Sequence, residues 1–143
     1  MAFYSSSISE LDLPDSITTI GEGAFEDCSN LISVEIPGSV TEIKGETFFG
    51  CISLEHAVIP DSVTYIGWGA FADCENLTTL EIPSSVTEIG ESAFEMTNVL
   101  NGITQQATYY VTLLVERGSY AASYAEEYGV PYTYADSDDW LYD

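Results

Sequence analysis

The sequence predicts a repeat solenoid, a β-rich coil of 23-residue repeats that is closed at its C-terminal end by a cap of helix and strand. Three observations predict this fold. The chain contains four near copies of one segment, each copy alternates apolar and polar residues, and a helix signal follows the last copy. A fixed period of this length is typical of stacked repeat units.

The repeats occupy residues 1–98, and the last full copy is one residue shorter than the others. Full copies span residues 8–30, 31–53, 54–76 and 77–98. Residues 1–7 read as a partial repeat, because "AFYSSSI" aligns with "AFEMTNV" at the end of the last copy. From this alignment we expect the chain to be the C-terminal piece of a longer array, with Met1 as a cloning start.

Each repeat contains two segments in which apolar and polar residues alternate, such as "LTTLEIP" and "SVTEIG". Alternation is typical of short strands with one buried face. A small-aromatic step, "AF", follows the second segment in most copies. The best-kept apolar columns are Leu13, Ile36, Ile59, Ile82; Ile20, Ile43, Ile66, Ile89; and Phe25, Phe48, Phe71, Phe94.

Proline and glycine mark the corners of the repeat. A proline follows the first strand in every copy and ends it, because proline cannot donate to a strand ladder. A glycine column (Gly21, Gly67, Gly90) predicts a tight bend after the second strand, with Lys44 as the exception. A unit of 23 residues cannot bury its own apolar face, so the copies are expected to stack into one continuous core.

The pattern "IPxSVTxIGxxAFxxCxxL" resembles the BspA-like leucine-rich repeats of bacterial and some protist surface proteins. The resemblance covers residues 8–98 at some ten columns in four copies. It implies a right-handed leucine-rich-repeat superhelix whose first strand, around "SVEI" and "TTLEI", lines a concave sheet. It also implies an extracellular or cell-surface location and binding of host or matrix proteins, although no export signal is present in this chain.

Residues 99–135 are interpreted as a degenerate repeat followed by the cap, and residues 136–143 as an acidic tail. Ser119 is placed to cap a helix that runs to about Tyr128 and ends at Gly129. Tyrosines recur along this helix at every fourth position and predict one stripe that covers the open end of the last coil. These residues are Tyr120, Tyr124 and Tyr128.

The charge of the chain excludes several classes of partner. Asp and Glu number 24 against two basic residues, Lys44 and Arg117, which gives a net charge of −22. Such a field repels phosphate backbones and anionic lipids, so nucleic acid and membrane-surface binding are disfavoured, and no apolar run of about 18 residues predicts membrane insertion. The charge suits a cationic partner, or it only keeps the surface soluble. The oligomeric state is not indicated.

No catalytic or metal site is predicted. Cys28, Cys51 and Cys74 share one column, each alone in its repeat, whereas metal sites need paired ligand spacings. They are interpreted as small buried apolar residues. His56 is the only histidine, no motif ties it to a nucleophile, and an exposed position is expected. We therefore predict no enzyme, no cofactor and no metal.

Candidate ligand-binding residues fall into two groups. Asp12, Glu35 and Glu81 share an outward column of the first strand, which Val58 interrupts. Stacked like charges repel one another, so a cation or a basic partner would relieve them, although exposed acids also keep strand edges from pairing. Calcium is not favoured, because no loop rich in Asp and Asn is present.

The second group lies in the third repeat, where Val58, Tyr65 and Trp68 replace polar or small residues of the other copies. Exposed aromatic residues are enriched in binding sites. Val58 and His56 belong to the first strand and Tyr65 and Trp68 to the second, so the two pairs are expected to face different sides. The alternative is ordinary surface variation, or packing by a neighbouring domain.

Two functions remain. The first is a non-catalytic binding or adhesion module of a bacterial surface or secreted protein, which recognises a protein or glycan ligand. The second is a passive structural spacer of a larger extracellular protein. The sequence does not separate the two.

Overall fold

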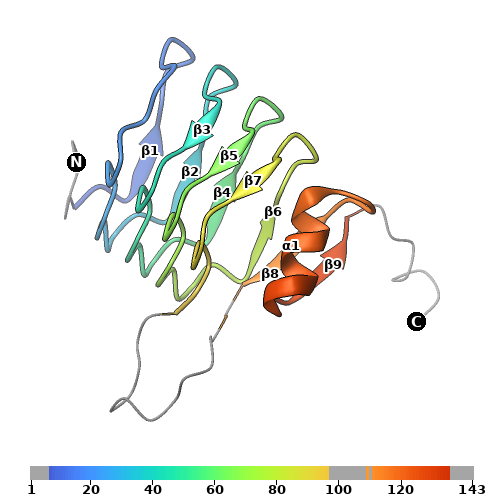
Figure 1. Cartoon of the computed structure of the whole chain (residues 1–143). Helices are drawn as coiled ribbons and strands as arrows, with labels where there is room; N and C mark the ends of the chain where they lie inside the picture. The colour runs from blue at the N-terminus through green and yellow to red at the C-terminus, as the bar shows by residue number, and fades with distance from the viewer. Residues whose placement is uncertain (1–6, 97–108, 110, 136–143) are drawn as a thin grey trace, which may run out of the picture.

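A computed structural model describes residues 7–96, 109 and 111–135. The chain winds into a stack of similar coils whose strands run parallel from coil to coil, with a helix at the C-terminal end of the stack (Figure 1). This architecture confirms the predicted repeat solenoid. The partial repeat 1–7 and the tail 136–143 lie outside the described residues, apart from Ser7.

The first strand of each repeat forms one side of the stack. These strands are β1 (Glu10–Asp12), β2 (Ser33–Glu35), β4 (His56–Val58) and β6 (Thr79–Glu81). β1, β2 and β4 are parallel and in register at the 23-residue spacing, so that Leu11, Val34 and Ala57 are direct neighbours. β6 lies beside β4 and begins a second sheet, in which β8 (Thr112–Val115) and β9 (Tyr132–Tyr134) follow.

The second strands form another side and are shorter. They are β3 (Glu42–Ile43), β5 (Tyr65–Ile66) and β7 (Glu88–Ile89), again parallel and in register. The first full repeat contributes no strand here, since its residues 17–20 join no ladder. Lys44, the exception in the glycine column, follows β3 and so faces this irregular repeat.

The structure shows that glycine is required in this column for a reason other than the tight bend predicted from the sequence. A Cβ atom on Gly67 would lie 2.4 Å from the backbone nitrogen of Gly45, and one on Gly90 would lie 2.4 Å from the backbone nitrogen of Trp68. Neither glycine has a positive φ. Glycine is therefore needed at these two positions because the chain there passes within contact of the backbone of the coil before it. A Cβ on Gly21, in the first described coil, would meet nothing within 4 Å.

The "AF" turns form the third side. Their backbone N–H groups donate to carbonyl groups of the next coil, as from Phe25 to Thr47 at 2.9 Å and from Phe48 to Ala70 at 2.9 Å. The turn opens at a left-handed residue, which is glycine in two repeats but Glu46 (φ 56°) and Ser92 (φ 55°) in the others. A side chain at this φ adds strain that glycine would not.

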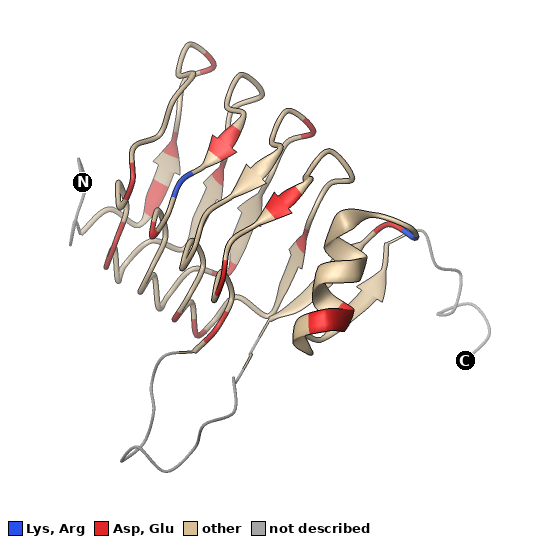
Figure 2. Ribbon diagram, viewed as in Figure 1, with Lys and Arg blue, Asp and Glu red and all other residues tan. Residues whose placement is uncertain are grey.

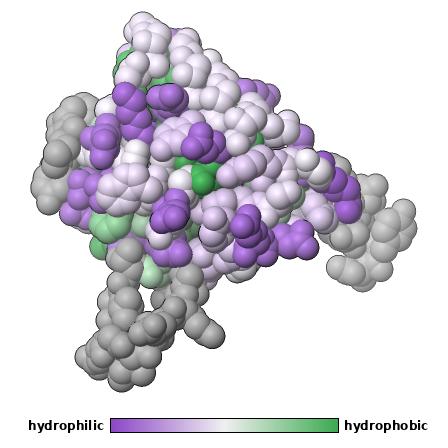
Figure 3. All heavy atoms as spheres, in the orientation of Figure 1, coloured by the Kyte–Doolittle hydropathy of each residue, from purple (hydrophilic) through white to green (hydrophobic). Residues whose placement is uncertain are grey.

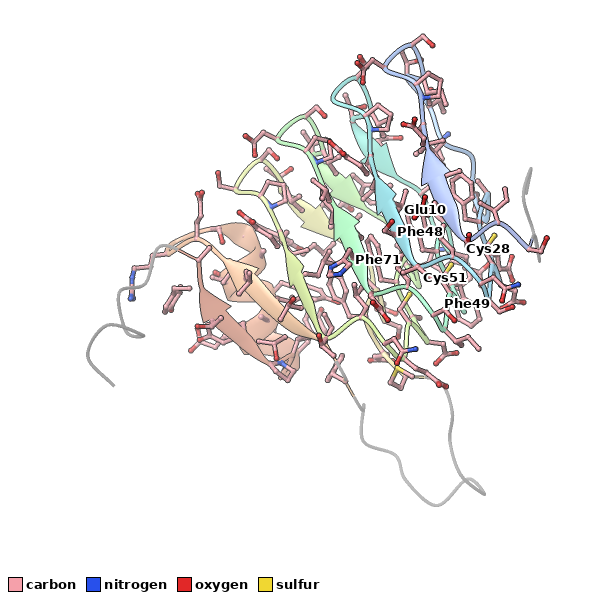
Figure 4. The ribbon with its side chains drawn as sticks, turned by 180° about the vertical axis from the view of Figure 1, so that it is seen from behind. Glu10, Cys28, Phe48, Phe49, Cys51 and Phe71 are labelled. Carbon is pink, nitrogen blue, oxygen red and sulfur yellow. The ribbon has the colours of Figure 1, made fainter. Side chains whose placement is uncertain are left out.

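The core lies between the three sides. The phenylalanine rings form a continuous stack, with centroids 5.5, 5.3 and 6.1 Å apart from Phe25 to Phe94. The three cysteines are thiols buried in the same core, and Figure 4 labels Cys28 and Cys51. The thiol of Cys51 donates to the carbonyl of Phe25 at 3.1 Å, and burial raises its pKa to about 12. The column therefore acts as apolar packing that also links neighbouring coils.

The helix α1 (Tyr120–Tyr128) closes the stack. Ser119 caps it by accepting a hydrogen bond from the Ala122 N–H, and Gly129 ends it in the left-handed region, as predicted. The tyrosine stripe is only partly a lid. Tyr124 is buried, its ring meets Phe94 edge-on at 6.2 Å, and its hydroxyl donates to the Gly90 carbonyl. Tyr120 and Tyr128 are 40% and 50% exposed, because alanines at 121, 122 and 125 fill the rest of the contact.

Candidate functional site

The open face of β1, β2 and β4 brings together one group of predicted residues. Asp12, Glu35 and Val58 are direct neighbours in register and all three are exposed. The next outward row along the same strands is formed by Glu10, Ser33 and His56. Figure 4 views the molecule from the side of these strands. Because both rows project from hydrogen-bonded strands, the backbone beneath them is fixed at the spacing of a parallel sheet.

Two adjoining hollows lie on this face. One, of about 610 Å³, covers the middle of β1, β2 and β4 and is lined by both outward rows. The other, of about 380 Å³, lies at the proline corner, where Asp15, Pro37 and Pro60 join the wall. Asp12, Glu35 and Val58 line both hollows, so the two form one continuous surface, which we term the trough.

Glu81, the third acidic residue of the predicted column, lies on β6 and is exposed, but it lines neither hollow. Val58, 53% exposed, separates it from Asp12 and Glu35 along the column. The structure therefore places Asp12, Glu35, His56 and Val58 in one site and leaves Glu81 at its side.

Tyr65 and Trp68 lie apart from the trough, as expected from their strand. Tyr65 is half-buried on β5, in register between Glu42 and Glu88. Trp68 follows β5 and is 50% exposed. Among the described residues no ring contact joins the two. They are not a stacked pair, and we refer to the two residues together as the aromatic surface. Figure 3 shows the face that carries β3, β5 and β7 as largely polar, with small separate apolar areas.

Trp68 has a structural partner that the sequence reasoning missed. A Cβ atom on Gly45 would lie 2.8 Å from the indole Nε1 of Trp68, so the indole occupies the space that a side chain at position 45 would fill. The signal was present in the alignment, since position 45 is the counterpart of position 68 one repeat earlier. Glycine in one coil makes room for tryptophan in the next.

Negative charge is spread over the whole stack (Figure 2). No Lys or Arg lines either hollow of the trough, and the Arg117 guanidinium lies over the Tyr134 ring, 4.1 Å from its centroid. On the turn side, burial together with the charges of Glu26, Glu22 and Asp27 raises the pKa of Glu46. The field of the protein therefore favours cations over the surface as a whole.

Within residues 7–96, 109 and 111–135, no cluster of three or more His, Cys, Asp or Glu side chains is arranged to hold a metal ion. The described part of the chain also contains no helix that is long and apolar enough to span a bilayer.

A parallel solenoid of short repeats with an open strand face is the architecture of leucine-rich repeat proteins, among other solenoids. Residues 1–112 match the BspA type leucine rich repeat region in six copies. The chain belongs to this family. A search of curated proteins found no match.

Solved structures resemble the chain as well. A leucine-rich repeat protein from Bacteroides ovatus is 38% identical with a TM-score of 0.60, and the leucine-rich repeat protein of T. pallidum is 38% identical with a TM-score of 0.62. Each alignment covers 64% of this chain, and it covers 25% and 44% of those proteins respectively. The pneumococcal vaccine antigen PcpA shares the fold at 12% identity and a TM-score of 0.53, over 94% of this chain and 44% of that one. The chain thus spans less than half the length of each.

Proposed function

We propose that this chain is a non-catalytic binding module of a bacterial surface or secreted protein, and that it holds a protein or glycan ligand on the open face of β1, β2 and β4. One observation carries the proposal. The trough combines two adjoining hollows, of about 610 and 380 Å³, on the face of a regular parallel sheet. Ligand sites are typically concave and largely formed before the ligand arrives.

The stack supports a preformed site. Each strand under the trough is held by its neighbour through a parallel ladder, and the buried residues beneath, Val34 and Ile36, are 3% and 2% exposed. A rigid site loses little conformational entropy on binding, which raises affinity. Similarity to bacterial leucine-rich repeat proteins, one of them a vaccine antigen, supports placement outside the cell.

The aromatic surface of Tyr65 and Trp68 is the second candidate site on the same module. The indole rests on Gly45 and keeps half of its surface in solvent, which suits a stacking contact with a sugar or an aromatic side chain. A passive spacer is the competing function, and the uninterrupted stack of phenylalanine rings suits a rigid rod.

Three variants separate these proposals in a binding screen against immobilised extracellular matrix proteins and a glycan array. Val58→Arg fills the trough with a long charged side chain at an exposed position. Tyr65→Ala with Trp68→Ala removes the aromatic surface. Thr78→Arg, an exposed position outside both hollows, controls for the added positive charge.

We expect wild-type binding to at least one class of probe, lost in Val58→Arg and kept in Thr78→Arg and in the aromatic double variant. Loss in the aromatic variant alone would move the site to Tyr65 and Trp68. A wild-type chain that binds no matrix protein and no glycan would overturn the proposal in favour of the spacer.

A further inference from the structure

We infer that the trough receives an extended, lysine- or arginine-bearing segment of a partner protein. This inference rests on the proposed binding function and adds the chemistry of the partner. It draws on three features of the trough: the sign of its charges, the apolar residues beside them, and its extent from the middle of the strands to the proline corner.

The Asp, Glu, Lys and Arg side chains that line the trough are all acidic. Asp12 and Glu35 are direct neighbours on adjacent strands, and Glu10 and Asp15 line the two ends of the surface. Carboxylates on adjacent strands of a sheet are about 4.8 Å apart along the ladder and repel each other. A cationic group between Asp12 and Glu35 would replace this repulsion with two attractive interactions.

Apolar surface lies beside the carboxylates. Val58 is 53% exposed where the other repeats carry an acid, and the half-buried Pro60 lies at the corner next to it. Exposed apolar residues in a hollow gain most from an apolar ligand group. Lysine and arginine match both features, because their long stems cover apolar surface while the charged end stays at the acids. A small inorganic cation would leave Val58 and Pro60 uncovered.

The dimensions favour a segment over a single side chain. The two hollows together reach from the middle of the sheet to the proline corner, and each falls in the roughly 300–1,000 Å³ range of ligand sites. An extended chain places alternate side chains on one face, so two basic side chains can reach the two hollows while the intervening residues face away.

The test uses a fluorescein-labelled peptide of four alternating Lys-Val pairs, with the same peptide carrying acetylated lysines as the neutral probe. The key variant is Asp12→Asn with Glu35→Gln, which removes two carboxylates from the trough with little change in shape. Its matched control is Glu42→Gln with Glu88→Gln, which removes the same charge from exposed positions on β3 and β7.

We expect the lysine peptide to bind the wild type and the acetylated peptide to bind much less. The trough variant should raise Kd about tenfold, the effect of losing two exposed ion pairs, and the control should raise it less than about twofold. Val58→Thr, which changes no charge, should raise Kd about threefold. Binding should also weaken between 20 and about 300 mM salt.

Equal weakening by the two double variants would show attraction to the whole acidic surface and overturn the inference, as would equal binding of the acetylated peptide. A second comparison repeats the test at a different position, with Asp15→Asn in the trough and Asp61→Asn at the same column outside it. If Val58→Arg abolishes matrix or glycan binding while the peptides do not discriminate, this inference fails and the binding function stands.

Discussion

The indole of Trp68 lies over Gly45, its counterpart one coil earlier, with Nε1 2.8 Å from the position of a Cβ atom on that glycine. The contact fixes a half-exposed tryptophan at the edge of the second-strand face. It also means that this exposed aromatic residue has a packing role in addition to any role in binding.

Replacement of Gly45 by alanine is expected to displace the indole, because the end of a side chain yields more easily than the coil backbone. In a Trp140→Phe background, the emission of Trp68 should shift to the red and acrylamide should quench it more strongly. Gly38→Ala is the control, since a Cβ there meets nothing within 4 Å. Unchanged emission in Gly45→Ala would show that the contact does not hold the ring.

Gly67→Ala is expected to lower the free energy of unfolding by about 2–3 kcal/mol, because the new methyl group would overlap the backbone of Gly45. Gly21→Ala changes the same column where the space is open, and should stay within about 0.5 kcal/mol of the wild type. Urea unfolding measures both. Similar losses of unfolding free energy in the two variants would indicate that the column requires glycine for its backbone conformation and not for the close approach of neighbouring coils.

Glu46→Gln is expected to stabilise the chain in a pH-dependent manner. The pKa of Glu46 is raised in the folded state by burial and by Glu26, Glu22 and Asp27, so folding favours its protonated form. The stability that comes from this preference for the protonated form is therefore fully present below the ordinary Glu pKa of 4.5. It is lost as the pH rises through the raised pKa of the folded state.

The difference in unfolding free energy between Glu46→Gln and wild type should consequently grow with pH from below 4.5 and then level off. Urea unfolding at a series of pH values measures it. A difference that is constant over the series would contradict the expected charge effect.

Tyr124→Phe removes the hydroxyl that donates to the Gly90 carbonyl and is expected to cost about 1 kcal/mol of unfolding free energy. Tyr120→Phe removes a hydroxyl from an exposed ring of the same helix and should cost less than about 0.5 kcal/mol. Thermal unfolding compares the two. A larger loss in Tyr120→Phe would indicate that the exposed end of the stripe also holds the cap.

The period of 23 made most of the fold predictable, because a repeated column such as Ile20, Ile43, Ile66 and Ile89 must take one position in every coil. The cap of α1 was predictable because Ser119 and Gly129 act locally. The role of Gly67 was not, since it depends on how closely neighbouring backbones approach.

For the candidate site, the sequence predicted which residues are exposed but not the hollows that they line. Alternation showed that Asp12, Glu35 and Val58 point outward and share a column, but the hollows depend on how the strands and the proline corner lie in space. The separation of Glu81 from the trough has the same origin, because alternation places residues on a face without showing how far a hollow extends.

Alkylation of the three buried cysteines would report the separation of neighbouring coils. Burial raises the pKa of Cys51 to about 12 and that of Cys74 well above its ordinary value, so at neutral pH neither offers the thiolate that alkylating reagents require. Alkylation of these two thiols therefore requires that a coil first separates from its neighbour. Because the cysteines stand in three consecutive repeats, the order in which mass spectrometry finds them alkylated would reveal whether the stack frays coil by coil or opens as a whole.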